Sequence, residues 1–404
     1  MKTSPAAVDG FVHVAKLNRV SEKMIDTILF YFCLTTIVYI YAGYPAIVLV
    51  WGFLKPKTVQ KKDFEPTVTI LIAAYNEEAC IGQTIQNKLA LDYPPEKLNI
   101  TVISDGSEDN TDNIVKSFAD PRVHLLRQEP RAGKTAALNM AVARETSDIL
   151  VFSDANSIYE PQALRRLVSN FADPQVGYVT GKMVYTEVDG TLVGDGCSAY
   201  MKYENLLRRA ETRIGSVVGV DGGIDAVRRQ AYRTMNPDQL PDFVLPLKVV
   251  EQGLRVVYEP QAILMEDSLK TVQDEYKMRV RVTLRALWAL FDMRTLLFNK
   301  NNPLFAWQLW SHKSLRYMCF LFLVGLYGSN LALIADGWFY VTFFILQNGA
   351  IFVAAFYTRI ARVVGSNALF RLVNYFAILN VAAMHACVKF IRGQKQIIWT
   401  PRKG

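Results

Sequence analysis

Four long apolar stretches constrain this chain more than any other feature of its sequence. One lies over residues 24–54, and three more lie over residues 317–335, 338–357 and 372–391. The first contains a single charged side chain, Asp26, and a helix needs about 20 apolar residues to cross a bilayer. A cleaved secretory signal is shorter and ends in small residues. We therefore predict an uncleaved membrane-spanning helix at residues 24–54 and three further spans after a polar middle.

The polar middle has the size of one globular domain. The whole chain is 51% hydrophobic and only 20% charged, but residues 55–316 have ordinary globular polarity. The expected order is a tail, a span, one domain, amphipathic interfacial helices, three spans and a basic tail. Their expected bounds are 1–23, 24–54, 55–272, 273–315, 316–391 and 392–404.

The net charge of +8 does not require a nucleic-acid partner. It reflects 45 basic against 37 acidic residues, and much of the excess flanks the apolar stretches, as at Lys55, Lys57, Arg392 and Lys403. Basic residues gather on the cytoplasmic side of membrane helices. We therefore expect a multi-pass protein of the cell membrane whose partner is the lipid bilayer rather than nucleic acid.

Within the domain, apolar runs alternate with amphipathic stretches. This pattern is typical of an α/β fold with an open, mostly parallel sheet and helices on both faces. The strands are expected at residues 68–74, 98–104, 123–127, 148–153 and 176–185. The helices between them are expected at residues 77–91, 109–119, 133–144 and 161–171.

Polar side chains follow three of the expected strands. Asn76 and Glu77 follow the first, Asp105 follows the second, and Asp154 and Asn156 follow the fourth. Each one alone is compatible with a helix cap or a turn. Together they place acidic and amide groups on one edge of the sheet, where such folds bind ligands.

Five short motifs follow one another across the domain. They are TILIAAYNEE at residues 69–78, VISDGS at 102–107, RAGKTAALN at 131–139, SDAN at 153–156 and PDF at 241–243. In order and spacing they resemble the family 2 glycosyltransferases with a GT-A fold, and most of all the membrane-embedded cellulose, chitin, hyaluronan and poly-N-acetylglucosamine synthases. Several ordered motifs are more specific than any single one. The resemblance implies an inverting hexosyl- or N-acetylhexosaminyl-transferase.

The resemblance places the nucleotide of a UDP-linked sugar donor at the ends of the first two strands. The residues concerned are Ala74, Tyr75, Asn76, Glu77 and Asp105. An Asp at a strand end can accept a hydrogen bond from a ribose hydroxyl or a base N–H. The alternative for Asp105 is turn stabilisation toward Ser107. Lys134 follows Gly133 at a helix start, where backbone N–H groups favour an anion, so we expect it to contact the diphosphate.

Asp154 corresponds to the first acid of the family's metal-binding D-x-D motif. A divalent ion held by carboxylate oxygen neutralises a diphosphate leaving group, and Mg²⁺ or Mn²⁺ fits this role. The sequence has Asn156 where the second Asp of the motif usually stands. One carboxylate is therefore lost, although an amide oxygen can still coordinate a metal.

Asp242 is the expected general base that takes the proton of the acceptor hydroxyl. The family carries an Asp followed eleven residues later by Gly and an apolar strand, which Asp242, Gly253 and residues 255–258 reproduce. The alternative is that Asp242 caps a helix over residues 243–251. Asp221, Gly222 and Gly223 lie where the family has its acceptor-binding turn, although Asp221 is also compatible with a simple turn.

The resemblance departs from the processive synthases after the general base. Their Q-x-x-R-W motif is represented by Met278 to Val282, which keeps Arg281 but has neither the Gln nor the Trp. We expect Arg281 to contact the diphosphate. Lys277, Arg281 and Arg285 share one helical face, so the alternative is a helix that lies against anionic lipid headgroups. Trp288 lies further along and is a candidate for the missing aromatic.

The expected product is a surface or extracellular polysaccharide. The alternatives are transfer of a single sugar to a lipid acceptor and an inactive scaffold subunit of a secretion complex. Four spans are few for a channel, so further secretion subunits or a second copy are candidate partners. Nucleotide sugars are cytosolic, so the domain is expected to face the cytoplasm. Four full spans then leave the basic tail outside, against the charge rule, unless one C-terminal stretch is interfacial or re-entrant.

Overall fold

The catalytic-sized domain is built on one mixed sheet of eight strands. The computed structural model describes residues 5–186, 192–267, 272–364 and 367–395. The sheet order is β3-β2-β1-β4-β7-β6-β8-β5, in which β1 to β4 are parallel to one another and β7 is antiparallel to both of its neighbours. The strands are β1 Val68–Ala74, β2 Leu98–Asp105, β3 Val123–Gln128, β4 Ile149–Asp154, β5 Ile158–Tyr159, β6 Val176–Thr186, β7 Ile224–Arg228 and β8 Arg255–Asp267.

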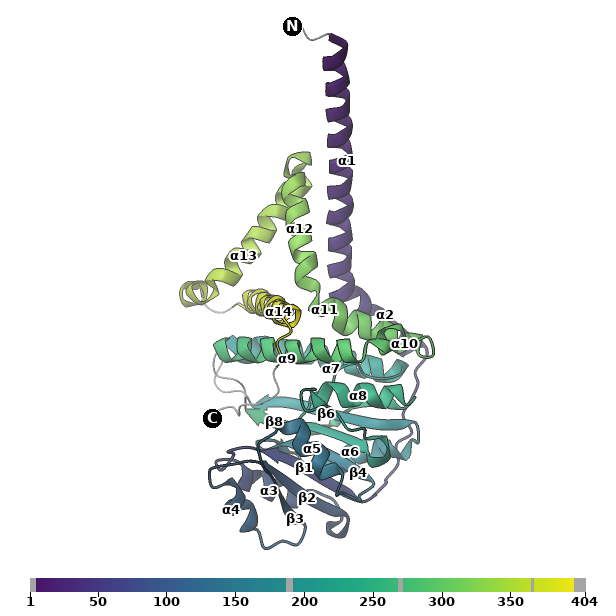
Figure 1. Ribbon diagram of the computed structural model, residues 1–404, viewed down its shortest axis with the longest axis vertical. Helices are drawn as coiled ribbons and strands as arrows, with labels where there is room; N and C mark the ends of the chain where they lie inside the picture. The colour runs from purple at the N-terminus through teal and green to yellow at the C-terminus, as the bar shows by residue number, and fades with distance from the viewer. Residues whose placement is uncertain (1–4, 187–191, 268–271, 365–366, 396–404) are drawn as a thin grey trace.

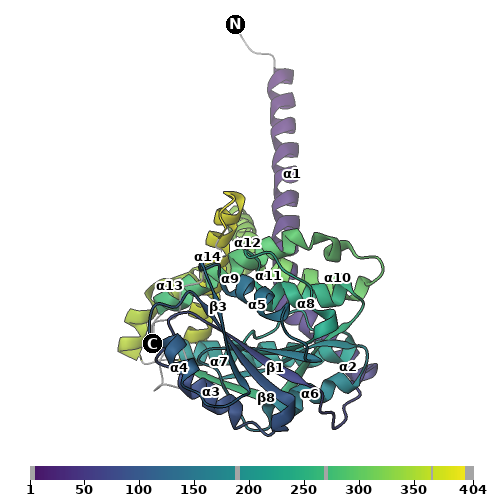
Figure 2. The same cartoon turned by 60° about the horizontal axis from the view of Figure 1, so that its bottom comes forward.

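Helices cover both faces of the sheet, as the α/β prediction requires (Figures 1 and 2). One face packs against α3 Ile81–Leu89, α4 Thr111–Lys116 and α6 Ala163–Ser169. The other packs against α5 Lys134–Val142, α8 Pro241–Glu251 and α9 Val272–Asp292. Every residue of β1 is buried, because a central parallel strand is covered on both sides.

The expected strands and helices are present, with shorter helices. The helix expected from residue 77 begins at Ile81, because Asn76 has a positive φ of 54° and the next residues bond to the neighbouring loop. Three elements were not expected: β5, β7 and the long helix α7 Leu192–Ile214. Helix α7 lies between the sheet and the apolar helices in Figure 1.

The N-terminal apolar helix is not one straight span. Helix α1 runs over Pro5–Val38, so part of the expected tail is helical, and a π-helical turn at Tyr39–Gly43 joins it to α2 Tyr44–Leu54. Tyr44 and Val48 of α2 pack against α7 of the domain. Figure 1 shows α1 standing away from the domain while α2 lies on it.

Four helical segments have the length and composition to cross a membrane: Ser21–Leu54, Cys319–Asp336, Trp338–Arg362 and Ala368–Ile391. The last three correspond to α12 Cys319–Leu333, α13 Trp338–Val364 and α14 Ala368–Ile391. Helix α13 includes Arg359 and Arg362, and α14 includes Arg371. The helical hydrogen-bond pattern continues past the apolar run.

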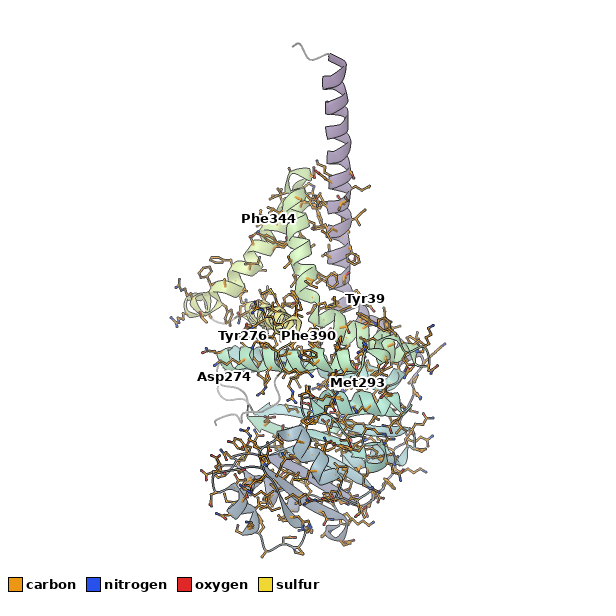
Figure 3. The ribbon with its side chains drawn as sticks, viewed as in Figure 1. Tyr39, Asp274, Tyr276, Met293, Phe344 and Phe390 are labelled. Atoms are coloured by element: carbon orange, nitrogen blue, oxygen red, sulfur yellow. The ribbon has the colours of Figure 1, made fainter. Side chains whose placement is uncertain are left out.

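Helix α14 differs in direction from α1. Figure 1 looks along α14 while α1 stands upright, so α14 runs across the direction of α1. It packs against α9, and Tyr276 of α9 and Phe390 of α14 mark this junction in Figure 3. Beyond α14, Lys395 forms an ion pair with Asp238 of the domain, with an N–O distance of 2.5 Å. The described residues that follow α14 therefore reach the domain at Lys395.

The predicted interfacial region is helical and packs on the domain. After α9 it contains η5 Arg294–Phe298, α10 Pro303–Leu309, a π-helical turn η6 Trp310–Ser314 and α11 Leu315–Tyr317. Phe305 of α10 is buried in the domain core, and Trp307 packs against Tyr44 and Trp51 of α2. The region thus joins the sheet domain to the N-terminal helix.

Candidate active site

A cavity of about 1590 Å³ opens where the carboxyl ends of the strands meet α9, α14 and the end of α1. Most predicted site residues line it: Tyr75, Asn76, Glu77, Lys134, Asp154, Asn156, Asp221, Gly222, Asp242 and Arg281. Ala74, Asp105 and Gly223 are buried and do not line the cavity. The sequence motifs therefore converge on one cavity.

The cavity has two sides. The strand-end side comprises Tyr75, Asn76, Glu77, Lys134, Asp154 and Asn156. The membrane side comprises Glu204, Arg208, Asp221, Lys313 and Arg316, which also line the cavity. Asp242 lies at the start of α8.

The loops after β1 and β2 are joined by hydrogen bonds that fix the strand-end side. The backbone N–H of Asn76 donates to Ser107 Oγ at 3.2 Å, and its Oδ1 accepts from the N–H of Glu108 at 2.8 Å. The N–H of Glu77 donates to Thr111 Oγ1 at 2.9 Å. Burial raises the pKa of Glu77. These polar residues after each strand thus shape the edge of the sheet.

Asp105 is buried, and both of its carboxylate oxygens accept hydrogen bonds from the protein. Its carboxylate accepts from the N–H groups of Ala132 and Gly133, both at 2.9 Å, and from Gln128 Nε2 at 2.6 Å. Asp105 therefore holds the loop that leads into Lys134, rather than a turn toward Ser107. A nucleotide contact by Asp105 stays a prediction.

Lys134 and Asp154 meet in the cavity. Lys134 Nζ donates to Asp154 Oδ1 at 2.5 Å. Burial lowers the pKa of Lys134, but the carboxylates of Asp154 and Asp242 outweigh burial, so the net effect is a raised pKa. Nearby, the guanidinium of Arg131 lies 3.4 Å from the centroid of the Tyr75 ring. This side therefore offers a cation, a carboxylate and a flat aromatic surface.

Glu266 of β8 was not predicted as a site residue, yet it lines the cavity beside Asn156. Asn156 Nδ2 donates to Glu266 Oε1 at 3.4 Å. The two residues are far apart in the sequence, and β8 carries no motif that marks Glu266. Glu266 thus adds a carboxylate beside Asn156, and Asp154, Asn156 and Glu266 all line the cavity.

Asp242 is not a helix cap. Helix α8 begins at Pro241, its N-cap is Leu240, and no side chain caps it. Among the described residues, Asp242 Oδ1 is buried without a hydrogen-bond partner. Gly222 has a φ of +88°, and a Cβ at this position would lie 2.5 Å from Asp242 Oδ2. The carboxylate is therefore packed against the glycine turn with one oxygen unpaired.

Asp221 is buried on the membrane side. Arg208 Nη1 lies 2.6 Å from its Oδ1, and the N–H of Met183 donates to its Oδ2 at 3.2 Å. Burial raises the pKa of Asp221, against the opposing effect of Arg208. An acceptor contact by Asp221 stays a prediction, and its observed contact is with Arg208.

Helix α9 presents three arginines to the cavity. Arg279, Arg281 and Arg285 line it, whereas Lys277 of the predicted basic face is exposed. Burial lowers the pKa of Arg285, and the carboxylate of Asp242 opposes this effect. Trp288 instead packs against Phe390 of α14, with ring centroids 4.6 Å apart. The aromatic rings of the cavity come from other elements: Tyr41, Tyr75, Tyr200, Tyr203, Tyr317, Tyr375 and Phe376.

A buried charged network, which sequence reasoning missed, supports the membrane side. His312 of η6 contacts Glu211 Oε1 through Nδ1 at 2.6 Å and Glu204 Oε2 through Nε2 at 3.1 Å. Tyr44 of α2 donates to Glu211 at 2.5 Å, and Arg316 pairs with Glu204. Burial raises the pKa of Glu204, but Arg316 and His312 outweigh it and hold the pKa well below its ordinary value. The network joins α2, α7 and η6.

Known proteins resemble the domain in sequence and nearly the whole chain in fold. The family described as glycosyl transferase family 2 matches residues 69–235. The poly-beta-1,6-N-acetyl-D-glucosamine synthase of Staphylococcus aureus (strain COL) is 30% identical over 221 residues, which are 53% of each chain. The probable glycosyltransferase YdaM of Bacillus subtilis (strain 168) is 27% identical over 241 residues, or 56% of each chain. The chain thus spans about half the length of the curated relatives it matches.

One solved structure matches nearly the whole chain. It is the mannosyltransferase PcManGT from Pyrobaculum calidifontis in complex with GDP-Man and Mn²⁺, with a TM-score of 0.70 and 21% identity over 91% of this chain and 99% of that chain. This likeness confirms the GT-A fold together with its apolar helices. Residues 69–235 therefore resemble a family 2 glycosyltransferase domain, and the fold of the chain resembles that of the mannosyltransferase.

Proposed function

We propose that this protein is an inverting glycosyltransferase that moves a sugar from a nucleoside-diphosphate sugar, with UDP as the nucleotide, to a hydroxyl of a surface polysaccharide. The observation that carries the proposal is the convergence of Asp154, Lys134 and the unpaired Asp242 on one cavity. The named activities of the relatives support it. The same convergence argues against an inactive scaffold subunit, which would not need an unpaired carboxylate.

The strand-end side binds the donor in this proposal. Tyr75, Asn76 and Glu77 face the nucleotide, while Lys134 and Arg281 contact the diphosphate. Cations there offset the charge that develops on the leaving group. When the donor binds, its diphosphate competes with Asp154 for Lys134, so the ion pair seen in the structure is expected to open.

A divalent metal is part of the proposal, because the oxygen donors of Asp154, Asn156 and Glu266 fit Mg²⁺ or Mn²⁺. The structural neighbour described with Mn²⁺ supports the same assignment. The metal would neutralise the leaving diphosphate. Glu266 would then replace the second acid of the D-x-D motif.

Asp242 acts as the general base. As the acceptor oxygen bonds to the anomeric carbon, its proton passes to Asp242, and the bond from that carbon to the diphosphate breaks. A single displacement of this kind inverts the anomeric centre. The unpaired Oδ1 is free to accept the proton, and the missing Cβ at Gly222 leaves room for the other oxygen.

Replacement of the general base tests the assignment. We expect Asp242→Asn to lower transfer by about 100-fold or more, while UDP binding, measured by calorimetry, persists. Asp238→Asn is the matched control, because Asp238 precedes α8 and pairs with Lys395 outside the cavity lining. A fully active Asp242→Asn enzyme would exclude Asp242 as the base.

The product defines the reaction class. Purified full-length protein is incubated with a panel of labelled nucleotide sugars, and the chain length of the product is measured. Long chains are expected from polysaccharide synthesis. A product with a single added sugar would instead support the alternative, which is transfer to a lipid. The domain is expected on the cytoplasmic side of the cell membrane, which protease protection of oriented vesicles tests.

A further inference from the structure

Lys313 is a cation of the cavity that has no counterion in the part of the chain that the structure describes. It projects from η6 into the membrane side, and among the described residues it has no hydrogen-bond or ion-pair partner. Its Nζ lies 5.9 Å from the centroid of the Phe243 ring. A sheltered ammonium without a partner is costly, because it loses hydration without gaining a charge of opposite sign.

The neighbouring cations of the membrane side are all neutralised. Arg208 pairs with Asp221 at 2.6 Å, and Arg316 pairs with Glu204. Burial lowers the pKa of Lys313, the carboxylate of Glu204 opposes this, and Arg316 and Arg208 lower it further. The protein's own carboxylates on this side are thus committed to the arginines, and Lys313 is left for a ligand.

Lys313 lies against one end of a short turn, and the general base lies against the other end. A Cβ at Gly219 would lie 2.6 Å from Lys313 Nζ, and a Cβ at Gly222 would lie 2.5 Å from Asp242 Oδ2. The turn from Gly219 to Gly222 therefore touches both groups. An anion bound at Lys313 would sit beside the hydroxyl that Asp242 deprotonates.

The wall of the cavity continues from these charges onto the apolar helices. Ile37 comes from α1, Ala350 comes from α13, and Leu372, Phe376 and Leu379 come from α14. These helices are membrane-span candidates, and α14 lies across the direction of α1 (Figure 1). The cavity thus presents an unpaired cation at one place and an apolar surface next to it.

We propose that the acceptor is a lipid whose headgroup carries a phosphate near the hydroxyl that receives the sugar. Lys313 binds the phosphate, the apolar wall contacts the hydrocarbon chain, and Asp242 accepts the hydroxyl proton. The phosphate takes no part in bond exchange. This inference rests on the sugar transfer of the proposed function and gives it a lipid acceptor in place of the polysaccharide, since a neutral polysaccharide alone gives Lys313 no charge to bind.

A matched set of three probes tests the inference. Purified full-length protein in a neutral polyoxyethylene detergent is incubated with phosphatidylglycerol, with diacylglycerol of the same chains, or with glycerol phosphate, and the retained molecule is measured by mass spectrometry. Phosphatidylglycerol has the phosphate, the hydroxyls and the hydrocarbon chains. Diacylglycerol lacks the phosphate, and glycerol phosphate lacks the chains. We expect retention of phosphatidylglycerol to exceed that of both others by about tenfold or more, as for a charged hydrogen bond.

Variants link the retained lipid to the site. Lys313→Gln should lose this preference for the phosphate, and Lys313→Arg should keep it. Lys277→Gln is the control, because Lys277 is exposed on α9 and reports lipid bound to the outside of the protein. Equal retention of phosphatidylglycerol and diacylglycerol, or unchanged retention in Lys313→Gln, would overturn the inference. Preference for glycerol phosphate would show a site for a soluble phosphate instead.

Sugar transfer separates this result from the proposed function. Label transferred to a neutral polysaccharide at the same rate by the native protein and Lys313→Gln would keep the glycosyltransferase and reject the phospholipid acceptor. A Lys313-dependent phosphatidylglycerol preference without transfer from any nucleotide sugar to any acceptor would keep the lipid site and reject the proposed function.

Discussion

The two sides of the cavity hold their polar groups by different means. On the strand-end side, neighbouring loops are joined by bonds between backbone N–H groups and side chains, as between Asn76 and Glu108. On the membrane side, buried ion pairs connect elements that are distant in the chain, as between Glu204 and Arg316. The first side therefore depends on local loop conformation, and the second depends on the docking of helices.

The largest expected effect comes from breaking the buried network of the membrane side. Glu204→Ala leaves Arg316 and His312 without their shared carboxylate, so we expect the free energy of unfolding to fall by about 3–5 kcal/mol. Unfolding in denaturant measures the loss, and the folded fraction should bind UDP as before. Glu65→Ala is the control, since Glu65 pairs with Arg165 at the surface and should cost about 1 kcal/mol or less. Equal losses of stability in the two variants would show that the buried pairs contribute no more than the surface pair.

The next effect tests the turn between the two sides. Gly222→Ala forces a Cβ to within 2.5 Å of Asp242 Oδ2, so we expect transfer to fall by about 100-fold. Gly253→Ala is matched to it, because Gly253 also has a positive φ but has open space around it. Gly253→Ala should cost about 1 kcal/mol of stability and leave transfer unchanged. Rate measurements on both variants decide the point, and an active Gly222→Ala enzyme would contradict the packing argument.

A smaller effect sharpens the account of the strand-end side. Asn156→Asp restores a carboxylate beside Asp154 and Glu266, so Mn²⁺ should bind about tenfold more tightly. Electron paramagnetic resonance of free Mn²⁺ measures the affinity without any turnover. Asn113→Asp, on the exposed surface of α4, is the control for added charge. Unchanged affinity in Asn156→Asp would place the metal elsewhere.

The smallest effect concerns Asp225 of β7. Its carboxylate interacts electrostatically with Lys134 on the strand-end side and with Asp221 on the membrane side. Burial raises its pKa from 3.8 to about 7. As the pH rises from about 4 to about 7, the unfolded chain releases this proton first, so the free energy of unfolding falls. Asp225→Asn should reduce that fall by about 1 kcal/mol or more.

Thermal unfolding as a function of pH measures this difference between Asp225→Asn and the native protein. Asp63→Asn, whose carboxylate is 81% exposed, should leave the pH dependence unchanged. A native-like pH dependence in Asp225→Asn would mean that another group titrates in this range.

The strand-end side was largely predictable because its residues are close in sequence to the strands that carry them. Asn76, Asp105 and Asp154 follow apolar runs whose alternation identifies the sheet. The partners of Asp105 were not predictable, since the loop at Ala132 and Gly133 folds back from the next strand. Asp242 was found through its spacing to Gly253, but only the structure distinguished an unpaired carboxylate from a helix cap.

The sequence by itself determined the apolar helices, the α/β domain between them and the family motifs, because each depends on local pattern and composition. Only the tertiary structure decided that Glu266 stands beside Asn156, that Lys313 has no counterion among the described residues, and that Lys395 pairs with Asp238. These facts depend on contacts between distant segments. Such contacts are fixed when α7, α9 and α14 pack on the sheet, which no local pattern records.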